Sequence, residues 1–236
     1  MNLNINLLLF LILCNINFSQ TSMDLDIIQG IKNPNLVGDT IKLEKNTFDA
    51  FNRMLIAAKR DGIDLKIVSA YRGYDRQKLI WNTKFKKFTT EFNLNPTQAI
   101  YEIIRFSTIP GTSRHHWGTE VDIIDNNYPD EEDVLIAEKF EKGGVFFKVK
   151  SWLNINSEKF GFYITYDNNP NRKGFEHEPW HYSYAPISKK MLSLFIKSDL
   201  KKAIKKDEIK GSAYFTDDFI EKYKKEYILD INKDLK

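Results

Sequence analysis

The four histidines of this chain fall in two short segments, and each segment also carries carboxylates. The first segment holds His115, His116 and Asp122, and the second holds His177 and His181. Imidazole nitrogens are the commonest protein ligands for zinc, and a carboxylate can complete the set. Two imidazoles, one carboxylate and an open fourth position are typical of a catalytic zinc site, whereas structural sites are closed. The pattern therefore predicts a zinc ion that activates water.

His177 and His181 frame a His-Glu-x-x-His pattern, which in helical zinc proteases places both imidazoles on one helix face. Pro179 argues against a helix here, because a proline in a helix interior costs about 3 kcal/mol. In an extended strand the two histidines share a face but lie too far apart for one metal ion. We therefore expect His181 to be a ligand and His177 not to be one.

Glu178 is the candidate general base. In a regular strand its side chain would face away from His181, because side chains alternate. Pro179 favours a bend that brings the two residues to one side. A glutamate beside an activated water is well placed to accept its proton. The alternative is a surface glutamate in a loop.

In the first segment, Gly118 lies between His115 and Asp122 and permits a tight turn. A histidine in a loop and an aspartate in a strand can then converge on one ion. The spacing alone does not choose between His115 and its neighbour His116. Strand alternation places Glu120 on the same face as Asp122.

The elements that must position these segments are helices around a few short strands. Apolar periodicity predicts helices over 48–58, 75–92, 96–106, 131–142, 146–160 and 186–205, and strands over 65–69, 119–124, 162–166 and 180–184. This order predicts an α+β domain in which helices flank a small antiparallel sheet that carries the zinc site. No repeat is present.

The length of 236 residues fits one compact domain with a tail. Acidic and basic residues are mixed and the net charge is +3, so no basic stripe points to a nucleic-acid partner. We expect a zinc peptidase domain over 20–206. Residues 207–236 are predicted to form a lysine-rich C-terminal extension.

Residues 1–19 are a predicted signal peptide. The apolar run from Leu7 to Leu13 has the length of a secretory segment and falls short of the about 20 residues that span a bilayer. The segment lacks Lys and Arg, so a buried strand or an uncleaved anchor is the alternative. A lipid anchor at Cys14 is disfavoured because Leu13 is bulky. We expect an exported protein of the periplasm or cell envelope, with no transmembrane domain after signal cleavage.

Three motifs in this chain match one known family pattern. They are Ser69-Ala70-Tyr71-Arg72 with Gln77, then Ser113-x-His115-x-x-Gly118-x-x-x-Asp122, and finally Glu178-x-x-His181. In these three motifs the chain resembles the D-alanyl-D-alanine carboxypeptidases of the VanY type. They belong to a fold group that also includes lysostaphin-like and hedgehog-like zinc domains.

The resemblance implies that His115, rather than His116, binds zinc together with Asp122 and His181. It also implies that Glu178 is the base.

The resemblance further implies that Arg72 polarises the scissile carbonyl and steadies the oxyanion, while Ser113 and Gln77 help to hold the substrate. Glu120 is a departure, because many members carry alanine there. It could be a partner of the zinc ligands or could narrow the choice of substrate.

The implied activity is zinc-dependent removal of the terminal D-alanine from peptidoglycan stem peptides that end in D-Ala-D-Ala. Two alternatives remain: a peptidoglycan endopeptidase of the same fold, and a zinc module that binds a partner without catalysis. Glu178 and Arg72 argue against the non-catalytic alternative.

Overall fold

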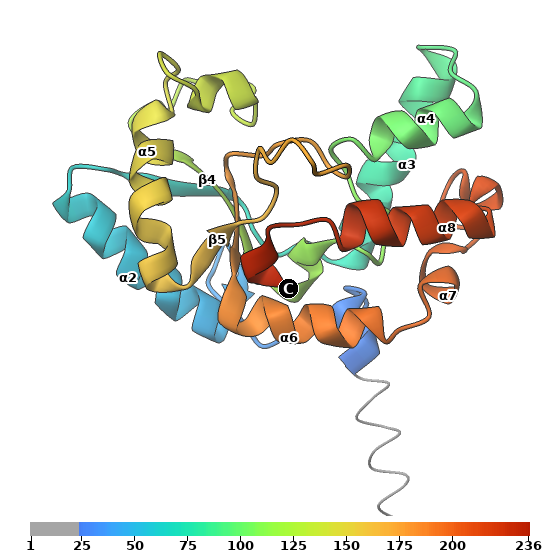
Figure 1. Cartoon of the computed structure of the whole chain (residues 1–236), viewed down its shortest axis with the longest axis horizontal. Coiled ribbons are helices and arrows are strands. Elements are labelled where there is room, and N and C mark those ends of the chain that lie inside the picture. The colour runs from blue at the N-terminus through green and yellow to red at the C-terminus, as the bar shows by residue number, and fades with distance from the viewer. Residues whose placement is uncertain (1–23) are drawn as a thin grey trace, which may run out of the picture.

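A computed structural model describes residues 24–236, so the predicted signal peptide and Cys14 lie outside the described residues. Four strands form an antiparallel sheet in the order β3-β4-β6-β5 (Figure 1). Their bounds are Leu65–Ser69 for β3, Glu120–Asp125 for β4, Phe162–Ile164 for β5 and His181–Tyr184 for β6. Two further strands, β1 (Leu36–Val37) and β2 (Leu43–Glu44), form a separate pair. The predicted α+β class with a small antiparallel sheet is confirmed.

Helices surround this sheet. The α-helices are α2 (Lys45–Arg60), α3 (Tyr74–Thr90), α4 (Pro96–Ile103), α5 (Phe147–Asn156), α6 (Ala185–Ile196), α7 (Leu200–Ile204) and α8 (Asp217–Tyr223). Short 3-10 turns are η1 (Arg114–Trp117), η2 (Ala137–Phe140), η3 (Ser157–Phe160), η4 (Ser212–Tyr214) and η6 (Lys233–Leu235), and a π-helical turn, η5 (Lys224–Ile228), follows α8. Among the described residues, no helix combines the length and apolar character needed to cross a membrane.

One face of the sheet packs against α2 and α5, which lie together on one side of the molecule (Figure 1). Val121 and Ile123 of β4 point to this face and are fully buried with residues of both helices. Because side chains alternate along a strand, Glu120 and Asp122 point to the opposite face. The apolar pattern of β4 thus determines which face carries the candidate site.

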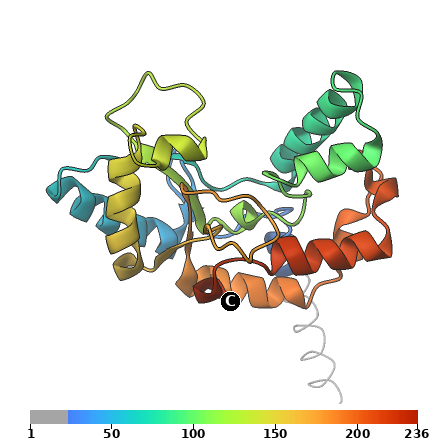
Figure 2. The ribbon, with the colours of Figure 1, turned by 45° about the horizontal axis from the view of Figure 1, so that its top comes forward.

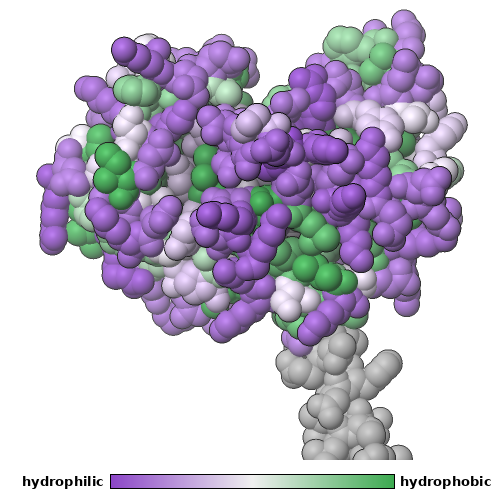
Figure 3. Space-filling model, in the orientation of Figure 1, coloured by the Kyte–Doolittle hydropathy of each residue, from purple (hydrophilic) through white to green (hydrophobic). Residues whose placement is uncertain are grey.

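A second hydrophobic cluster fills the other half of the molecule, where α3, α4, α6 and α8 gather (Figure 2). Trp81 and Trp117 lie in it, and so do Phe215, Tyr223 and Leu235 from the C-terminal part of the chain. The lysine-rich residues after 206 therefore contribute apolar side chains to the core and lysines to the surface, which is mostly hydrophilic in the view of Figure 3. The domain boundary at 206 stays a prediction.

The C-terminal segment also makes polar contacts with distant loops. The Tyr223 hydroxyl accepts a hydrogen bond from the Ile109 N–H (3.1 Å) and lies 2.9 Å from the Thr112 hydroxyl. The Asn232 side chain donates to the carbonyl of Ile164 at 2.9 Å, at the end of β5. The segment thus contacts both the chain before η1 and the last residue of β5.

Two predicted helices were wrong in extent. Residues 131–136 are not helical, because Asp133 has a φ of 45°, outside the right-handed helical region, and only the short turn η2 forms. The predicted helix over 186–205 is interrupted after Ile196. There the Asp199 side chain accepts a hydrogen bond from the Lys202 N–H and begins a new helix, α7, as N-caps do.

Candidate active site

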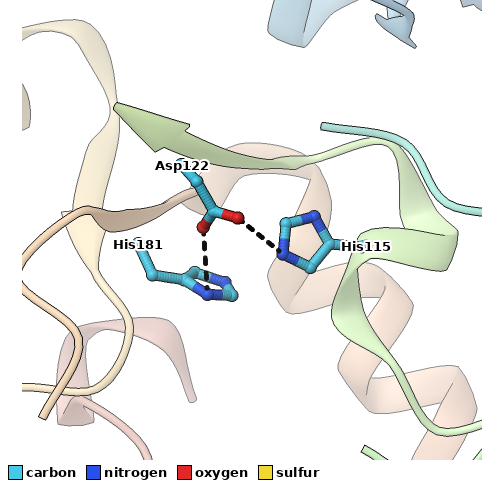
Figure 4. A group of neighbouring side chains, drawn as sticks. All are labelled: His115, Asp122 and His181. Carbon is cyan, nitrogen blue, oxygen red and sulfur yellow. Dashed lines mark ion pairs between the residues drawn. The ribbon is translucent and has the colours of Figure 1, made fainter. Parts of the chain in front are cut away.

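Three side chains converge on the face of the sheet that α2 and α5 leave free. His115 comes from η1, Asp122 from β4 and His181 from β6, and all three are buried and point toward one another (Figure 4). The Asp122 carboxylate lies 3.6 Å from His115 Nε2 and 3.5 Å from His181 Nδ1. Ligands of a tetrahedral zinc ion stand about 3.3–3.6 Å apart, given metal–ligand distances of about 2.0–2.2 Å. Both distances to Asp122 fall in or near this range, and the three ligand atoms lie within 4.8 Å of one another, so the group could hold one metal ion.

Strand register and one glycine create this arrangement. Asp122 of β4 is paired with His181 of β6, which brings the two side chains side by side. Gly118 ends η1 with φ of 69°, a left-handed conformation that other residues rarely adopt. A β-carbon there would lie 2.9 Å from the backbone nitrogen of Glu44. Gly118 thus lets the chain turn sharply from His115 into β4.

Hydrogen bonds orient both candidate imidazoles. His115 Nδ1 lies 2.7 Å from the Ala70 carbonyl, so that its Nε2 faces Asp122. His181 Nε2 lies 2.9 Å from a carboxylate oxygen of Glu120, so that its Nδ1 faces Asp122. Each ring therefore presents one nitrogen to the common point and uses the other nitrogen for support.

The other two histidines lie outside this group. His116 uses both ring nitrogens, with Nδ1 2.6 Å from the Arg72 carbonyl and Nε2 3.2 Å from the Gly111 N–H. His177 Nδ1 lies 2.8 Å from the Tyr166 carbonyl. Among the described residues, the group that could hold a metal comprises His115, Asp122 and His181 alone.

The carboxylates around the group favour a bound cation, whereas His181 would have to release a proton to bind one. Burial raises the pKa of Asp122 to about 6, and the Glu178 carboxylate adds to that shift. One oxygen of Asp122 is buried without a hydrogen-bond partner. Burial also opposes a charge on His181, but its bonds to Glu120 and Glu178 raise its pKa to about 10. A bound cation would favour the ionised carboxylate and give the orphaned oxygen a partner.

Glu178 lies beside the same group. The chain bends between Glu178 and His181, whose N–H donates to the Glu178 carbonyl at 3.1 Å. The bend puts the Glu178 carboxylate 2.9 Å from His181 Nδ1. The bend expected at Pro179 is therefore present, and it brings the candidate base to the metal-binding group.

Arg72 follows β3 and lies near the same group. Its guanidinium donates to the Gln77 side-chain oxygen at 2.9 Å and to the Ser69 hydroxyl at 3.0 Å. Burial lowers the pKa of Arg72, and the carboxylates of Asp122 and Glu178 oppose that shift. The charge of Arg72 is thus directed toward the candidate site.

Gln77 lies behind Arg72. It is fully buried, and its amide group donates to the Thr108 carbonyl at 2.7 Å. Both ends of its carboxamide are bonded within the protein, and it does not line the cavity described next. The structure therefore brings Gln77 to Arg72 and not to the space a substrate would occupy.

A cavity of about 320 Å³ opens over the metal-binding group. Its charged and polar lining residues are Arg72, Ser107, Thr108, Ser113, Arg114, His115, Asp122, Glu178 and His181. Its apolar and aromatic lining residues are Phe106, Leu135, Tyr166, Phe175 and Trp180. The sequence motifs identified most of the polar floor, whereas all the apolar lining residues except Trp180 lie outside the motifs.

Arg114 and Glu120 form a buried ion pair that the sequence analysis did not find. Arg114 Nη2 lies 3.3 Å from the Glu120 carboxylate, and both side chains are almost fully buried. Although burial opposes its charge, Arg114 and bonds from His181 and Ser183 hold the pKa of Glu120 well below its usual range. The only available signal was the occurrence of both residues inside the first histidine segment.

Comparisons with known proteins agree on one family. Residues 40–187 match the VanY family of D-alanyl-D-alanine carboxypeptidases. The Bacillus subtilis protein YodJ is 32% identical over 161 residues, which are 67% of this chain and 51% of YodJ. A D-alanyl-D-alanine carboxypeptidase of Enterococcus faecalis is 31% identical over 132 residues, which are 56% of this chain and 44% of the relative. The chain thus spans about half the length of these two curated relatives.

Solved structures show the same fold. VanYB, determined in complex with D-alanine-D-alanine, has a TM-score of 0.54 and 23% identity, over 75% of this chain and 91% of VanYB. A VanY D,D-pentapeptidase from a VanB-type resistance cassette, determined with Zn(II), has a TM-score of 0.52 and 23% identity, over 72% of this chain and 89% of the other. With the sequence match over more than half of its length, the chain belongs to the VanY family of D-alanyl-D-alanine carboxypeptidases.

Proposed function

We propose that this protein is an exported zinc-dependent D,D-carboxypeptidase. Its substrate is a peptidoglycan stem peptide that ends in D-Ala-D-Ala, from which it removes the last D-alanine. The observation that carries the proposal is the convergence of His115, Asp122 and His181 beside Glu178 at the floor of a cavity. The two VanY structures, one determined with D-alanine-D-alanine and one with Zn(II), support the choice of substrate and metal.

His115, Asp122 and His181 would hold the zinc ion, through His115 Nε2, the Asp122 carboxylate and His181 Nδ1. The distances around Asp122 and its orphaned oxygen support this ligand set. Bound there, zinc would supply a Lewis acid that activates water for attack on a peptide carbonyl.

Glu178 is the proposed general base. Its carboxylate lines the cavity next to His181 and is close to the three proposed ligands. It accepts a proton from the attacking water and then passes that proton to the leaving amine of D-alanine. Proton transfer by a positioned carboxylate contributes roughly a hundred- to ten-thousand-fold to the rate.

Arg72 is the proposed electrophile for the scissile carbonyl. Its guanidinium lines the cavity and is held by Gln77 and Ser69. A fixed cation directed at the carbonyl oxygen stabilises the negative charge that develops in the transition state. Gln77, which the sequence pattern suggested as a substrate contact, acts in this proposal by positioning Arg72.

Ser113 is the proposed contact for the substrate, because it lines the cavity and precedes His115 by two residues. The terminal carboxylate of the substrate would lie near Ser113, so that only a chain end fits. A site that binds the terminal carboxylate removes the last residue, as a carboxypeptidase does, whereas an endopeptidase must accept a chain that continues past the cleaved bond.

The test is digestion of a synthetic stem pentapeptide that ends in D-Ala-D-Ala, with zinc and after removal of metal by a chelator. The expected result is release of one D-alanine, which stops in the chelator and returns with zinc. A pentapeptide ending in D-Ala-L-Ala serves as the control for stereochemistry. Cleavage of cross-linked muropeptides without release of terminal D-alanine would assign an endopeptidase instead. Zinc binding without any cleavage would assign a non-catalytic zinc module.

A further inference from the structure

Glu120 is a fully buried carboxylate beneath the proposed zinc site. It is on the same strand face as Asp122, two residues earlier in β4. Its Oε2 lies 2.9 Å from His181 Nε2, the ring nitrogen that faces away from Asp122. The wall of the cavity does not include Glu120, so substrate does not reach it.

The surroundings of Glu120 hold it as a carboxylate in one orientation. Oε1 accepts hydrogen bonds from the hydroxyls of Ser183 (2.6 Å) and Thr119 (3.1 Å). Oε2 accepts one from the Thr165 hydroxyl at 3.2 Å in addition to the contact with His181. Donors from the residue before β4, from β6 and from the residue after β5 therefore all bond to one acidic group.

Arg114 supplies the compensating charge. It reaches Oε1 of Glu120 at 3.3 Å through Nη2, which also donates to the Ser183 hydroxyl at 2.8 Å. Its Nε and Nη1 are buried without hydrogen-bond partners. Hydrogen bonding by Arg114 is therefore incomplete, because two of its three guanidinium nitrogens have no acceptor. The guanidinium also lies over the Trp117 ring, 4.7 Å from its centroid, and pairing with Glu120 offsets the cost of burying both charges.

We propose that Glu120 is a positioning residue that fixes His181 with a proton on Nε2 and with Nδ1 directed to the zinc ion. The inference rests on the metal site in the proposed function. A metal-bound histidine whose other nitrogen donates to a carboxylate has a fixed tautomer and is a stronger ligand. His115 has the weaker arrangement, because its second nitrogen meets the neutral carbonyl of Ala70. The two imidazoles are thus unequal ligands, and His181 is the stronger one.

The experiment measures zinc affinity directly, without reference to turnover. The metal-free protein is titrated with zinc against a chromogenic chelator, for the wild type and for Glu120→Ala and Glu120→Gln. Loss of such a supporting carboxylate typically weakens metal binding by about 10–100-fold, and we expect this for Glu120→Ala. Glu120→Gln keeps the shape and an acceptor oxygen but not the charge, so we expect a smaller loss. If Glu120→Ala does not fold, Glu120→Gln carries the test.

Glu44 offers a matched control. It is also a buried glutamate, and it accepts hydrogen bonds from the Thr47 backbone and the Asn46 side chain at the start of α2. Glu44→Gln should lower the unfolding temperature while it leaves the zinc dissociation constant unchanged. A second readout is ¹⁵N NMR of the zinc-loaded protein. The Nε2 proton of His181 should be protected from exchange in the wild type and should exchange rapidly in the Glu120 variants.

The outcomes separate this inference from the proposed function. A wild-type protein that binds no zinc contradicts the proposed metal site itself. A wild-type protein that binds zinc, with Glu120 variants of equal affinity, contradicts only the role of Glu120. Equal losses of affinity in the Glu120 and Glu44 variants would reduce the effect to general destabilisation and would also overturn the inference.

Discussion

Replacement of Gln77 by methionine separates two roles that the carboxamide could have. The side chain is fully buried, receives a hydrogen bond from Arg72 and donates one to the Thr108 carbonyl. Methionine has a similar volume and makes neither bond. A bond to a charged group contributes about 1.5–3 kcal/mol and a neutral bond about 1 kcal/mol. We therefore expect Gln77→Met to lower the free energy of unfolding by about 2.5–4 kcal/mol.

The kinetic effect should fall on kcat. Without Gln77, the Arg72 guanidinium keeps only its bond to the Ser69 hydroxyl and loses its fixed direction. If the fixed direction of Arg72 stabilises the transition state by as much as one bond to a charged group, about 1.5–3 kcal/mol, kcat falls by about 10- to 150-fold with little change in KM. A side chain that held the substrate directly would instead raise KM.

The assay is steady-state release of D-alanine from the pentapeptide, with unfolding followed separately by circular dichroism. Asn82→Leu is the control, because Asn82 lies on the same helix and bonds to Glu208 and Lys210 rather than to Arg72. It should lose stability and keep both kinetic constants. In an Arg72→Lys background, Gln77→Met should add little, since both changes remove the same interaction. Wild-type kcat in a folded Gln77→Met protein would refute the reasoning.

Further predictions concern the metal, the base, the oxyanion contact and pH. Glu178→Gln should keep zinc and the fold but lose turnover by about 10²–10⁴-fold; retained turnover in the zinc-loaded variant would assign the base elsewhere. Arg72→Lys should be poorly active although lysine keeps the positive charge, and the loss should appear mainly in kcat, because lysine lacks the planar fork of donors. Unchanged kinetic constants would show that Arg72 is not part of the site. His181→Ala should abolish zinc binding in metal analysis while His177→Ala keeps it, and equal loss in both would favour the helical zinc-protease pattern. Burial lowers the pKa of His116 to about 4, so the folded protein resists its protonation and loses stability as pH falls from about 6.5 through about 4. Between pH 7 and pH 4, denaturant unfolding should therefore show the wild type losing about 3 kcal/mol more than His116→Asn; equal losses would contradict this.

The polar floor of the site was predictable because its residues carry chemistry in short motifs. Strand alternation correctly placed Glu120 and Asp122 on one face, and Pro179 correctly indicated the bend that brings Glu178 to His181. The short local pattern was sufficient because each of these positions is determined within a few residues.

The cavity walls were not predictable, because they depend on contacts between distant parts of the chain. Phe175 is held against Tyr227, 52 positions later in the sequence, with ring centroids 5.3 Å apart. The orientation of Gln77 likewise depends on Thr108, which belongs to another segment. In the predicted helix over 131–142, residues 131–136 are not helical, since Asp133 has a φ of 45° that apolar periodicity does not reveal.

The C-terminal segment has a consequence for how selectivity can diverge. The family match ends at residue 187, yet Tyr223 holds the backbone at Ile109 and Tyr227 supports Phe175 in the cavity wall. The proposed ligands and base are thus encoded in one stretch of the gene, and the scaffold that shapes the substrate cavity is encoded partly in another. Substitutions after residue 187 can therefore alter which peptide fits while every motif residue stays the same.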